Sequence, residues 1–304
     1  MNNKLTYYVT NEYNGIKIRD YLKDIKGLSG RFIKGAGRGG RIKINGKEVK
    51  LNYILNDGDK IEINVEKEES QNIEPEKMDL DIIYEDKDLI VVNKIPGIVV
   101  HPTKSHPSET LANGLIYHFR KNGEKCIVRL VNRLDMDTSG LVIIAKNQFA
   151  HMSLSYAMKN KEIEKSYLAI VHGTPKYDKA TINLPIDRPT MDSIKREVME
   201  NGKKSITHYE VLEYYSKGSL IKLRLETGRT HQIRVHLSHI GNPIYGDCLY
   251  GKKEYEYIKR QALHAYRIAF PHPKTGERIE LECDLPYDIK KLIYKISSKT
   301  TPQV

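Results

Sequence analysis

The stretch RLDMDTSGL, residues 133 to 141, leads into the apolar run VIIA and guides the interpretation of the whole chain. Turn-forming residues followed by β-branched residues predict a loop that enters a buried strand. The loop carries two carboxylates, Asp135 and Asp137, and one guanidinium, Arg133. Such groups occur together in calcium loops, in phosphotransfer sites and in sites that modify RNA, so the stretch is compatible with three kinds of chemistry.

The calcium interpretation fails at the twelfth position of the loop. A loop of the EF-hand type needs a bidentate acid there, because this hard cation requires many oxygen ligands. Counted from Asp135, that position is Lys146, whose positive charge repels calcium. The sequence therefore argues against an EF-hand site.

The sequence features that usually flank a phosphotransfer site are missing. Such a site requires an apolar strand that runs directly into the first aspartate, and further lysine and acidic residues around magnesium. Asn132 and Arg133 interrupt such a strand, and no suitable acidic pair follows downstream. A magnesium-dependent phosphotransferase is kept as a weak alternative.

The RNA-modifying interpretation starts from Arg133, two residues before Asp135. Guanidinium binds phosphate, stacks on bases and can fill the space that a displaced base leaves. Taken alone, the pair is more typical of an ordinary surface arginine beside an aspartate in a turn. Support for this interpretation has to come from other parts of the chain.

The chain is basic and long enough to bury a large core. Its 304 residues include 50 Lys and Arg against 39 Asp and Glu, a formal net charge of +11. This length predicts one large domain or two unequal ones. The charge would suit a polyanionic partner, although many cytosolic proteins share such a balance.

The cysteines and the apolar segments bear on the cellular environment. Cys126, Cys248 and Cys283 are isolated and form no CxxC pair, which argues against a zinc finger and against a disulfide framework. The N-terminal stretch MNNKLTYYVTNEYNG lacks the apolar region of a signal peptide, and runs such as GLVIIA are too short to span a bilayer. We expect a cytoplasmic, monomeric protein with no membrane association.

Charged and turn-forming residues divide the chain into a small and a large unit. EKEESQNIEPEKM, at residues 66 to 78, has little apolar content and predicts a linker over residues 67–78. Before it, residues 1–66 combine a helical spacing of apolar residues with two alternating segments, RIKINGKEV and DGDKIEINV, around Asn-Gly and Asp-Gly turns. We predict a small α+β unit here and a large domain over residues 79–304.

Part of the small unit is strongly basic. Between residues 31 and 50, seven basic residues accompany one acidic residue, Glu48. Such a run is most often a solvated surface, but it is also typical of a phosphate-binding face. The candidate RNA contacts in it are Arg31, Lys34, Arg38, Arg41 and Lys43. The GxGxxG spacing of Gly35, Gly37 and Gly40 has no buried strand before it and no helix after it, so we discount a dinucleotide site.

The large unit is predicted to contain a mixed, largely antiparallel sheet with irregularly placed helices, an α+β fold. Strand patterns occur in IIYED, LIVVNK, GLVIIAK, KSYLAIVHG, SITHYEVLEYY and LIKLRLETG. Helix patterns occur in TLANGLIYHFRK and AHMSLSYAMKN. A third helix is expected after Gly228, where Ile233, Leu237 and Ile240 share a face before Gly241 supplies a stop.

The set of motifs in this unit resembles the RluA-type family of RNA pseudouridine synthases. The motifs that carry the resemblance follow in family order over about residues 80–285, namely IIYEDKDLIVVNKIPGIVVHPT, NRLDMDTSGLVIIAK, KSYLAIVHG, TGRTHQIRVHL, PIYGD and LHAYRIAFPHP. One position departs from the pattern, because Asn132 stands where the family usually has His. Residues 15–66 resemble the αL-type RNA-binding module of a ribosomal protein and of many RNA-modifying enzymes, although glycines at 35, 37, 39 and 40 should weaken its second helix.

The resemblance implies an isomerase that converts uridine to pseudouridine without a cofactor or a metal. It gives Asp135 the role of catalytic carboxylate, which either attacks the anomeric carbon or acts as a base on the sugar. It pairs Arg234 with Asp135, and it makes Tyr167 the residue that stacks on the uracil. The target base has to leave its stack, and Arg133 is our candidate for the vacated space.

The substrate and one alternative function remain open at the level of sequence. The presence of an N-terminal RNA-binding module favours large-subunit ribosomal RNA over transfer RNA as the substrate. The alternative is a non-catalytic RNA-binding or ribosome-associated protein on the same scaffold. His231, His236 and His239 do not have the spacing of a metal site, because His231 would point away from the other two on a helix.

Overall fold

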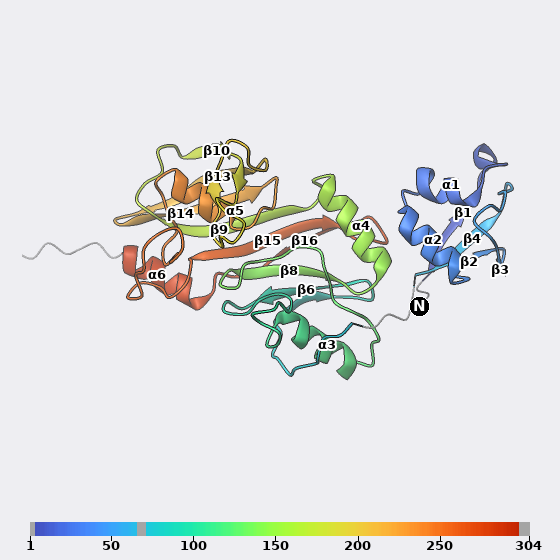
Figure 1. The fold of residues 1–304 in the computed structure, drawn as a ribbon, viewed down its shortest axis with the longest axis horizontal. Coiled ribbons are helices and arrows are strands. Elements are labelled where there is room, and N and C mark those ends of the chain that lie inside the picture. The colour runs from blue at the N-terminus through green and yellow to red at the C-terminus, as the bar shows by residue number, and fades with distance from the viewer. Residues whose placement is uncertain (1–3, 66–70, 298–304) are drawn as a thin grey trace, which may run out of the picture.

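The computed structural model describes residues 4–65 and 71–297, which form a four-stranded and a ten-stranded β-sheet with helices packed against them, and a separate two-stranded sheet (Figure 1). The strands of the large sheet pair antiparallel with one parallel exception among the described residues, β15 with β8. The predicted α+β class with a mixed, largely antiparallel sheet is confirmed. No helix among the described residues has the length and apolar character to cross a membrane.

The small sheet has the strand order β1-β4-β2-β3. Its elements are β1 (Lys4–Tyr8), η1 (Asn11–Tyr13), α1 (Ile18–Asp20), η2 (Tyr21–Ile25), α2 (Gly30–Arg38), β2 (Ile42–Ile44), β3 (Lys47–Glu48) and β4 (Lys60–Asn64). The predicted hairpin is present, because β2 and β3 pair around Asn45 and Gly46. Both turn residues have positive φ, 49° and 84°, as the tight turns of hairpins require.

The glycine-rich stretch forms a regular helix, α2, despite its low helix propensity. The Ser29 side chain accepts a hydrogen bond from the backbone N–H of Phe32 and caps the first turn. A Cβ at Gly37 would lie 2.8 Å from Cγ of Leu51, so glycine permits the close approach of the next segment. Burial of Phe32 and Ile33 on one face anchors the helix to the sheet, since tertiary packing outweighs intrinsic propensity.

The large sheet has the strand order β10-β13-β14-β9-β15-β8-β6-β5, with β16 beside β15 and β7 beside β8. Its strands are β5 (Ile82–Glu85), β6 (Leu89–Lys94), β7 (Arg129–Leu130), β8 (Ser139–Ala145), β9 (Glu164–His172), β10 (Lys179–Asn183), β13 (Ile206–Tyr215), β14 (Gly218–Leu225), β15 (Leu263–Pro271) and β16 (Arg278–Glu282). All seven residues of β8 are buried. Each buried Val, Leu or Ile there contributes about 2 kcal/mol, which makes β8 a rigid base for the loop before it.

Helices cover both faces of the large sheet (Figure 1). They are α3 (Leu111–Lys121), α4 (Gln148–Lys159), α5 (Gln232–His239) and α6 (Tyr287–Ser297). Apolar residues of α3 pack with Val142 and Ile144 of β8, while those of α4 pack with Leu141 and Ile143. Alternate residues of β8 therefore face different helices, as the two-residue period of a strand requires.

The expected linker is only partly described. Residues 66–70 lie outside the described residues, and residues 71–78 run along α3 rather than projecting into solvent. The carbonyl of Glu74 accepts a hydrogen bond from Asn113, the Gln71 side chain accepts one from the backbone N–H of Val128, and Ile73 is buried. The segment after residue 70 is thus bound to the large unit, because its backbone polar groups and Ile73 find partners there.

Helix α4 contributes to the cores of both units. Phe149 belongs to the apolar cluster of the small unit, where its ring centroid lies 6.2 Å from that of Phe32. The thioether of Met152 accepts a hydrogen bond from the backbone N–H of Ser29 at 3.1 Å. The small unit therefore packs on the outer face of α4.

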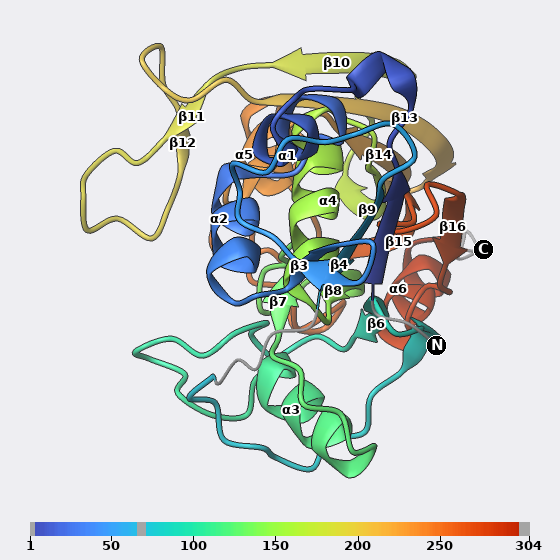
Figure 2. The same ribbon diagram turned by 90° about the vertical axis from the view of Figure 1, so that its right-hand side faces the viewer.

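Several elements escaped prediction. A projecting arm, residues 184–205, contains the short strands β11 (Ile186–Asp187) and β12 (Glu197–Val198) and extends from the sheet in Figure 2. Two-residue strands leave no detectable periodicity. Helix α6 had a signal, because Ile289, Leu292 and Ile296 recur at helical spacing and all three are buried.

Candidate active site

Residues 133–138 of RLDMDTSGL lie in the loop between β7 and β8, and Asn132, just before them, ties this loop to β8. The Asn132 side chain donates to the carbonyl of Leu141 at 3.2 Å and accepts from the N–H of Ile143 at 2.8 Å. Asn132 is buried, and it supplies the strand-like hydrogen bonds that close the loop. Asparagine at this position therefore supports the loop through its own amide group.

A buried lysine holds the other side of the loop. Lys94, at the end of β6, donates to the carbonyls of Ile95, Ile98 and Met136 at 2.8, 3.0 and 2.8 Å. Burial lowers the pKa of Lys94 to about 7, and nearby Asp137 and Asp135 oppose this effect. The carbonyl of Met136, the residue after Asp135, is fixed by this contact, which restricts the position of the carboxylate.

Arg234 joins Asp135 to a second, fully buried carboxylate. Its Nη1 lies 3.3 Å from Oδ2 of Asp135, while Nε and Nη2 donate to Asp247 at 2.6 and 2.8 Å. Burial alone would lower the pKa of Arg234, but the hydrogen bonds and charges of Asp247 and Asp135 outweigh it and raise that pKa. A bidentate pair of this kind fixes the guanidinium plane as well as its charge.

Tyr167 is the third predicted site residue that the fold brings to Asp135. It lies on β9 with 6% of its surface exposed. Burial raises the pKa of the Tyr167 phenol well above its usual range, and the charge of Asp135 adds to the effect. The phenol is therefore neutral at pH 7, close to a half-buried carboxylate, and presents an aromatic ring at the site.

Comparison with known proteins identifies the family. Residues 88–239 match the model of the RNA pseudouridylate synthase family. The chain is 41% identical to the uncharacterized RNA pseudouridine synthase YlyB of Bacillus subtilis over 286 residues, which cover 93% of this chain and 89% of that protein. The chain belongs to the RNA pseudouridine synthase family. It is therefore an isomerase that acts on RNA, as the sequence motifs predicted.

Other relatives of this synthase agree in sequence and in fold. Ribosomal large subunit pseudouridine synthase D of Neisseria meningitidis is 38% identical over 267 residues, covering 84% of this chain and 71% of that protein. Human RNA pseudouridylate synthase domain containing 1 superposes with a TM-score of 0.58 at 27% identity, covering 74% of this chain and 97% of that one. The pseudouridine synthase fold predicted for the large unit is confirmed.

Two residues of the site were not predicted, His231 and Asp247. Nε2 of His231 lies 3.8 Å from Oδ2 of Asp135. From the sequence, this histidine was considered as a metal ligand, which its spacing disfavours, and not as a neighbour of Asp135. Asp247 is fully buried beneath Arg234. Both residues lie in motifs that carry the family resemblance, TGRTHQIRVHL and PIYGD. The motifs therefore pointed to these positions, but no function was predicted for either residue.

The predicted RNA contacts lie outside this cluster. Arg133 is exposed at the start of the loop. In the small unit, Arg31, Lys34 and Arg38 are exposed on α2 and Lys43 is exposed on β2. Arg41 is half-buried and donates to the carbonyl of Asn64 at 3.2 Å. Figure 1 shows α2 and β2 in the small unit, apart from α5 with Arg234.

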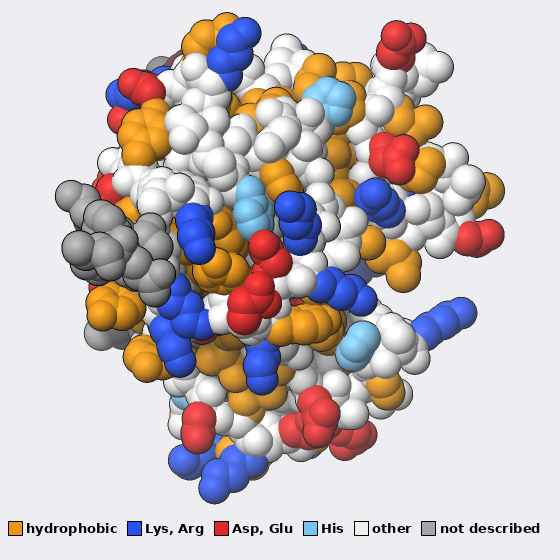
Figure 3. Space-filling view, turned by 90° about the vertical axis from the view of Figure 1, so that its left-hand side faces the viewer, with side chains coloured by type: hydrophobic (Ala, Val, Ile, Leu, Met, Phe, Trp, Pro, Cys, Tyr) orange, Lys and Arg blue, Asp and Glu red, His pale blue; other side chains and the backbone are white. Residues whose placement is uncertain are grey.

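The surface near the arm is hollowed, and its charges are mixed. Seen from the end opposite to that of Figure 2, two projections leave a notch between them at one edge of the large unit (Figure 3). Lys and Arg side chains alternate with Asp and Glu side chains on this face rather than forming one basic patch. The formal excess of positive charge is therefore not concentrated at this end of the synthase.

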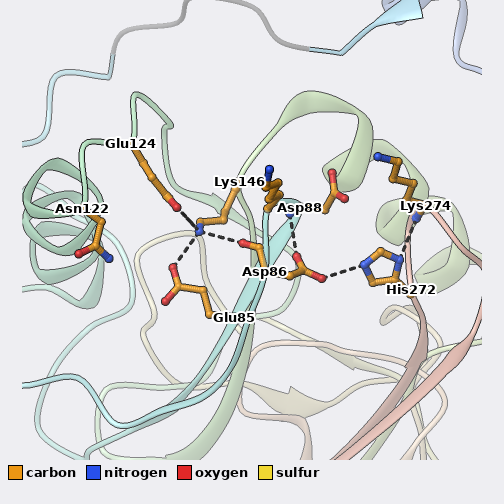
Figure 4. Close-up of a pocket in the computed structure, with 9 residues that line it drawn as sticks. Glu85, Asp86, Asp88, Asn122, Glu124, Lys146, His272 and Lys274 are labelled. Atoms are coloured by element: carbon orange, nitrogen blue, oxygen red, sulfur yellow. Dashed lines mark hydrogen bonds and ion pairs between the residues drawn. The ribbon is translucent and has the colours of Figure 1, made fainter. Parts of the chain in front are cut away.

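A second polar cluster lines an open cavity of about 460 Å³ away from Asp135 (Figure 4). Ligand atoms of Asp86, Asp88 and His272 lie within 4.8 Å of one another there, close enough for a metal ion. The possible ligand atoms already form hydrogen bonds, since Nε2 of His272 bonds Asp86 and Nδ1 accepts two backbone N–H groups. Asp88 accepts from Asn147. The polar atoms of this cluster hydrogen-bond to one another, which does not fit a metal site with free ligand atoms.

The remaining two histidines of the RTHQIRVHLSH segment have unrelated positions. His236 is buried and bonds Thr207 and the carbonyl of Leu184, each at 2.9 Å. His239 is exposed at the end of α5. Because His236 uses both ring nitrogens in the core, the structure favours a packing role for it.

Proposed function

We propose that this synthase isomerises uridines of large-subunit ribosomal RNA and that Asp135 is the catalytic carboxylate. The observation that carries the proposal is the pairing of a half-buried Asp135 with Arg234, whose own position is locked by Asp247. The guanidinium offsets the cost of a negative charge in a pocket that loses water when RNA binds. The ribosomal substrate is supported by relatives named ribosomal large subunit pseudouridine synthase D.

The geometry around Asp135 suits cleavage of a glycosidic bond. Both basic neighbours approach Oδ2, and among the described residues no hydrogen bond reaches Oδ1. Oδ1 is then the oxygen that meets the sugar, either as the nucleophile at the anomeric carbon or as the base that removes a sugar proton. Both routes need a carboxylate that is held from behind and open in front.

Tyr167 and Arg133 complete the proposed handling of the base. The neutral ring of Tyr167 offers a stacking surface for a uracil that has left its helix. The exposed Arg133 would occupy the space that the base vacates, since guanidinium stacks well on neighbouring bases. No cofactor is needed, because the same carboxylate can detach and reattach the base.

The small unit is proposed to hold RNA by its phosphates. Its exposed basic residues on α2 lie at positions 31, 34 and 38, which share one face of the helix. Their affinity for RNA would fall as salt rises, because phosphate contacts release bound counterions. The unit over residues 1–66 would then add affinity while the large domain over residues 79–304 performs the chemistry.

The test is release of tritium from uracil carbon 5. Transcripts of large-subunit ribosomal RNA and of transfer RNA, each labelled at that carbon, are incubated with the wild-type protein, with Asp135→Asn and with the matched control Asp137→Asn. We expect release from ribosomal RNA that Asp135→Asn abolishes and Asp137→Asn reduces only slightly. Activity of Asp135→Asn at the wild-type rate would contradict the catalytic assignment, and release only from transfer RNA would contradict the substrate.

A further inference from the structure

His231 occupies an unusual backbone position beside the catalytic carboxylate. Its φ and ψ are 58° and 16°, in the left-handed region, where residues other than glycine are uncommon and His, Asn and Asp are the most frequent of them. It is the residue immediately before α5, the helix that carries Arg234. Strained backbone of this kind concentrates at functional sites, where the surrounding structure enforces it. Here it accompanies a ring whose Nε2 lies 3.8 Å from Oδ2 of Asp135.

The other ring nitrogen of His231 is engaged by a tyrosine. Nδ1 lies 2.9 Å from Oη of Tyr250. That oxygen also accepts the backbone N–H of Arg196, in the projecting arm, at 2.7 Å. Among the described residues, the Tyr250 hydroxyl has no other acceptor for its proton, so it donates to Nδ1. The histidine proton is then on Nε2, the nitrogen that faces Asp135.

The charges around the ring favour the same neutral tautomer. A lone pair on Nε2 would be repelled by the Asp135 carboxylate, whereas an N–H is attracted. Burial lowers the pKa of His231, Asp135 and Asp247 oppose this effect, and the positive charges of Arg234 and Arg196 reinforce it. A proton on both nitrogens would also remove the acceptor that the Tyr250 hydroxyl uses.

We propose that His231 is a positioning residue for Asp135, which donates its Nε2–H to Oδ2, and that Tyr250 fixes the required tautomer through its contact with the arm. This rests on the proposed role of Asp135. In the free protein the distance is longer than a hydrogen bond, and such contacts often tighten only when substrate is bound. Arg234 and His231 then hold one carboxylate oxygen together and direct the other toward the sugar.

The connection gives the arm a role in the chemistry. Residues 193–196 are organised by the Arg196 side chain, which donates to the carbonyls of Ser193, Ile194 and Lys195 at 2.8, 3.1 and 3.2 Å. The backbone N–H of the same residue reaches Tyr250. A displaced arm would release the hydroxyl of Tyr250 and, through it, the tautomer of His231. The arm and the carboxylate are thus linked by two hydrogen bonds and one polar contact.

The first test reads the tautomer directly. The full-length protein is labelled with ¹⁵N-histidine, and the His231 signals are identified by their loss in His231→Gln. At pH 7 we expect a neutral ring that is protonated at Nε2, and in Tyr250→Phe a mixture of both tautomers. Tyr250→Phe keeps the ring under the guanidinium of Arg234, 5.1 Å away, and removes only the hydroxyl. A wild-type ring protonated at Nδ1, or at both nitrogens, would overturn the proposal.

The second test measures single-turnover pseudouridine formation. We expect His231→Leu to lower the rate by about a hundredfold with RNA affinity unchanged within about twofold, because misplacing a reacting group affects the chemical step. His231→Gln keeps an N–H donor, so its rate should be about tenfold higher than that of His231→Leu. The control is His239→Gln, at the other end of α5, which should keep the wild-type rate. A wild-type rate for His231→Leu, with Asp135→Asn inactive, would refute the role of His231 alone. If Asp135→Asn is active, the proposed function itself fails.

Discussion

Two clusters of this synthase combine carboxylates with buried basic residues. They differ in whether a carboxylate oxygen is left without a hydrogen-bond partner among the described residues. Around Lys146, the ammonium donates to Glu85, to Glu124 and to the carbonyl of Asp86, each at 2.8 to 2.9 Å. Around Arg234, the guanidinium is shared between fully buried Asp247 and half-buried Asp135. The first cluster uses its charges to stabilise the loop between β5 and β6.

The second cluster leaves one oxygen of Asp135 available. Its partners lie on one side of the carboxylate, and 28% of the Asp135 side chain is exposed. The presence of charged groups in a cavity therefore does not by itself indicate a reactive site. A carboxylate held from one side and open on the other is the feature that distinguishes the two clusters.

Among the substitutions that compare the two clusters, the largest expected effect comes from replacing the guanidinium of the active site. Arg234→Lys keeps the charge but loses the fork that binds Asp247 and reaches Asp135 together, so we expect a loss of about a hundredfold in single-turnover rate. Tritium release measures it. Arg278→Lys, which alters a surface pair with Glu164 and Glu280, is the matched control and should change the rate by less than about twofold. Equal effects of the two substitutions would show that the bidentate contact of the Arg234 guanidinium does not contribute to the rate.

A smaller effect on rate is expected from Asp247→Asn. The amide keeps one acceptor for Arg234 but loses the charge and the symmetrical bidentate contact, so the guanidinium is held less firmly. We expect a loss of about tenfold in rate with RNA affinity unchanged, measured by single-turnover kinetics and by filter binding. Glu85→Gln makes a similar change in the other cluster, because its carboxylate accepts from Lys146, and a comparable loss of rate there would contradict the distinction between the clusters.

The cluster around Lys146 should respond in stability instead of rate. Lys146→Met removes a donor whose side chain is 4% exposed; it leaves the carbonyl of Asp86 without this donor and Glu85 with His118 as its remaining partner. We expect the free energy of unfolding to fall by about 2 kcal/mol. This is less than the loss for a fully buried ion pair, because Glu85 and Glu124 both contact water. Denaturant titration measures it. Lys274→Met, at the exposed edge of the same cavity, should change it by less than about 0.5 kcal/mol.

The smallest effect concerns acid stability. Burial opposes ionisation of Glu85, but hydrogen bonds from Lys146 and His118 outweigh it and lower its pKa, and hydrogen bonds from Tyr84 and backbone N–H groups likewise lower the pKa of Asp86. Stability gained from a lowered pKa is complete above the unfolded value, about 4, and is lost as pH falls through the folded value. Unfolding free energy should therefore decline below about pH 4. Lys146→Met should make this decline shallower, and an unchanged slope would contradict the assigned partners.

Much of the fold was predictable because its signals are local. The short apolar runs of LIVVNK and GLVIIAK predicted β6 and β8, Asn45 and Gly46 predicted the hairpin of the small unit, and helix patterns predicted α3 and α4. The glycine-rich stretch was expected to weaken its helix, and it forms α2 through packing of residues distant in sequence. The strands of the arm were too short to produce a pattern.

By itself the sequence determined which residues were candidates, Asp135, Tyr167 and Arg234, because they lie in motifs of fixed composition. Only the tertiary structure decided how they work together. Asp135 and Arg234 are 99 residues apart, and the fold places Asp247 beneath the arginine and His231 beside the carboxylate. Local periodicity specifies which face of a strand or helix is buried. The direction of a charged side chain depends instead on partners brought together by the whole sheet, because electrostatic and hydrogen-bond contacts require distances that no local pattern encodes.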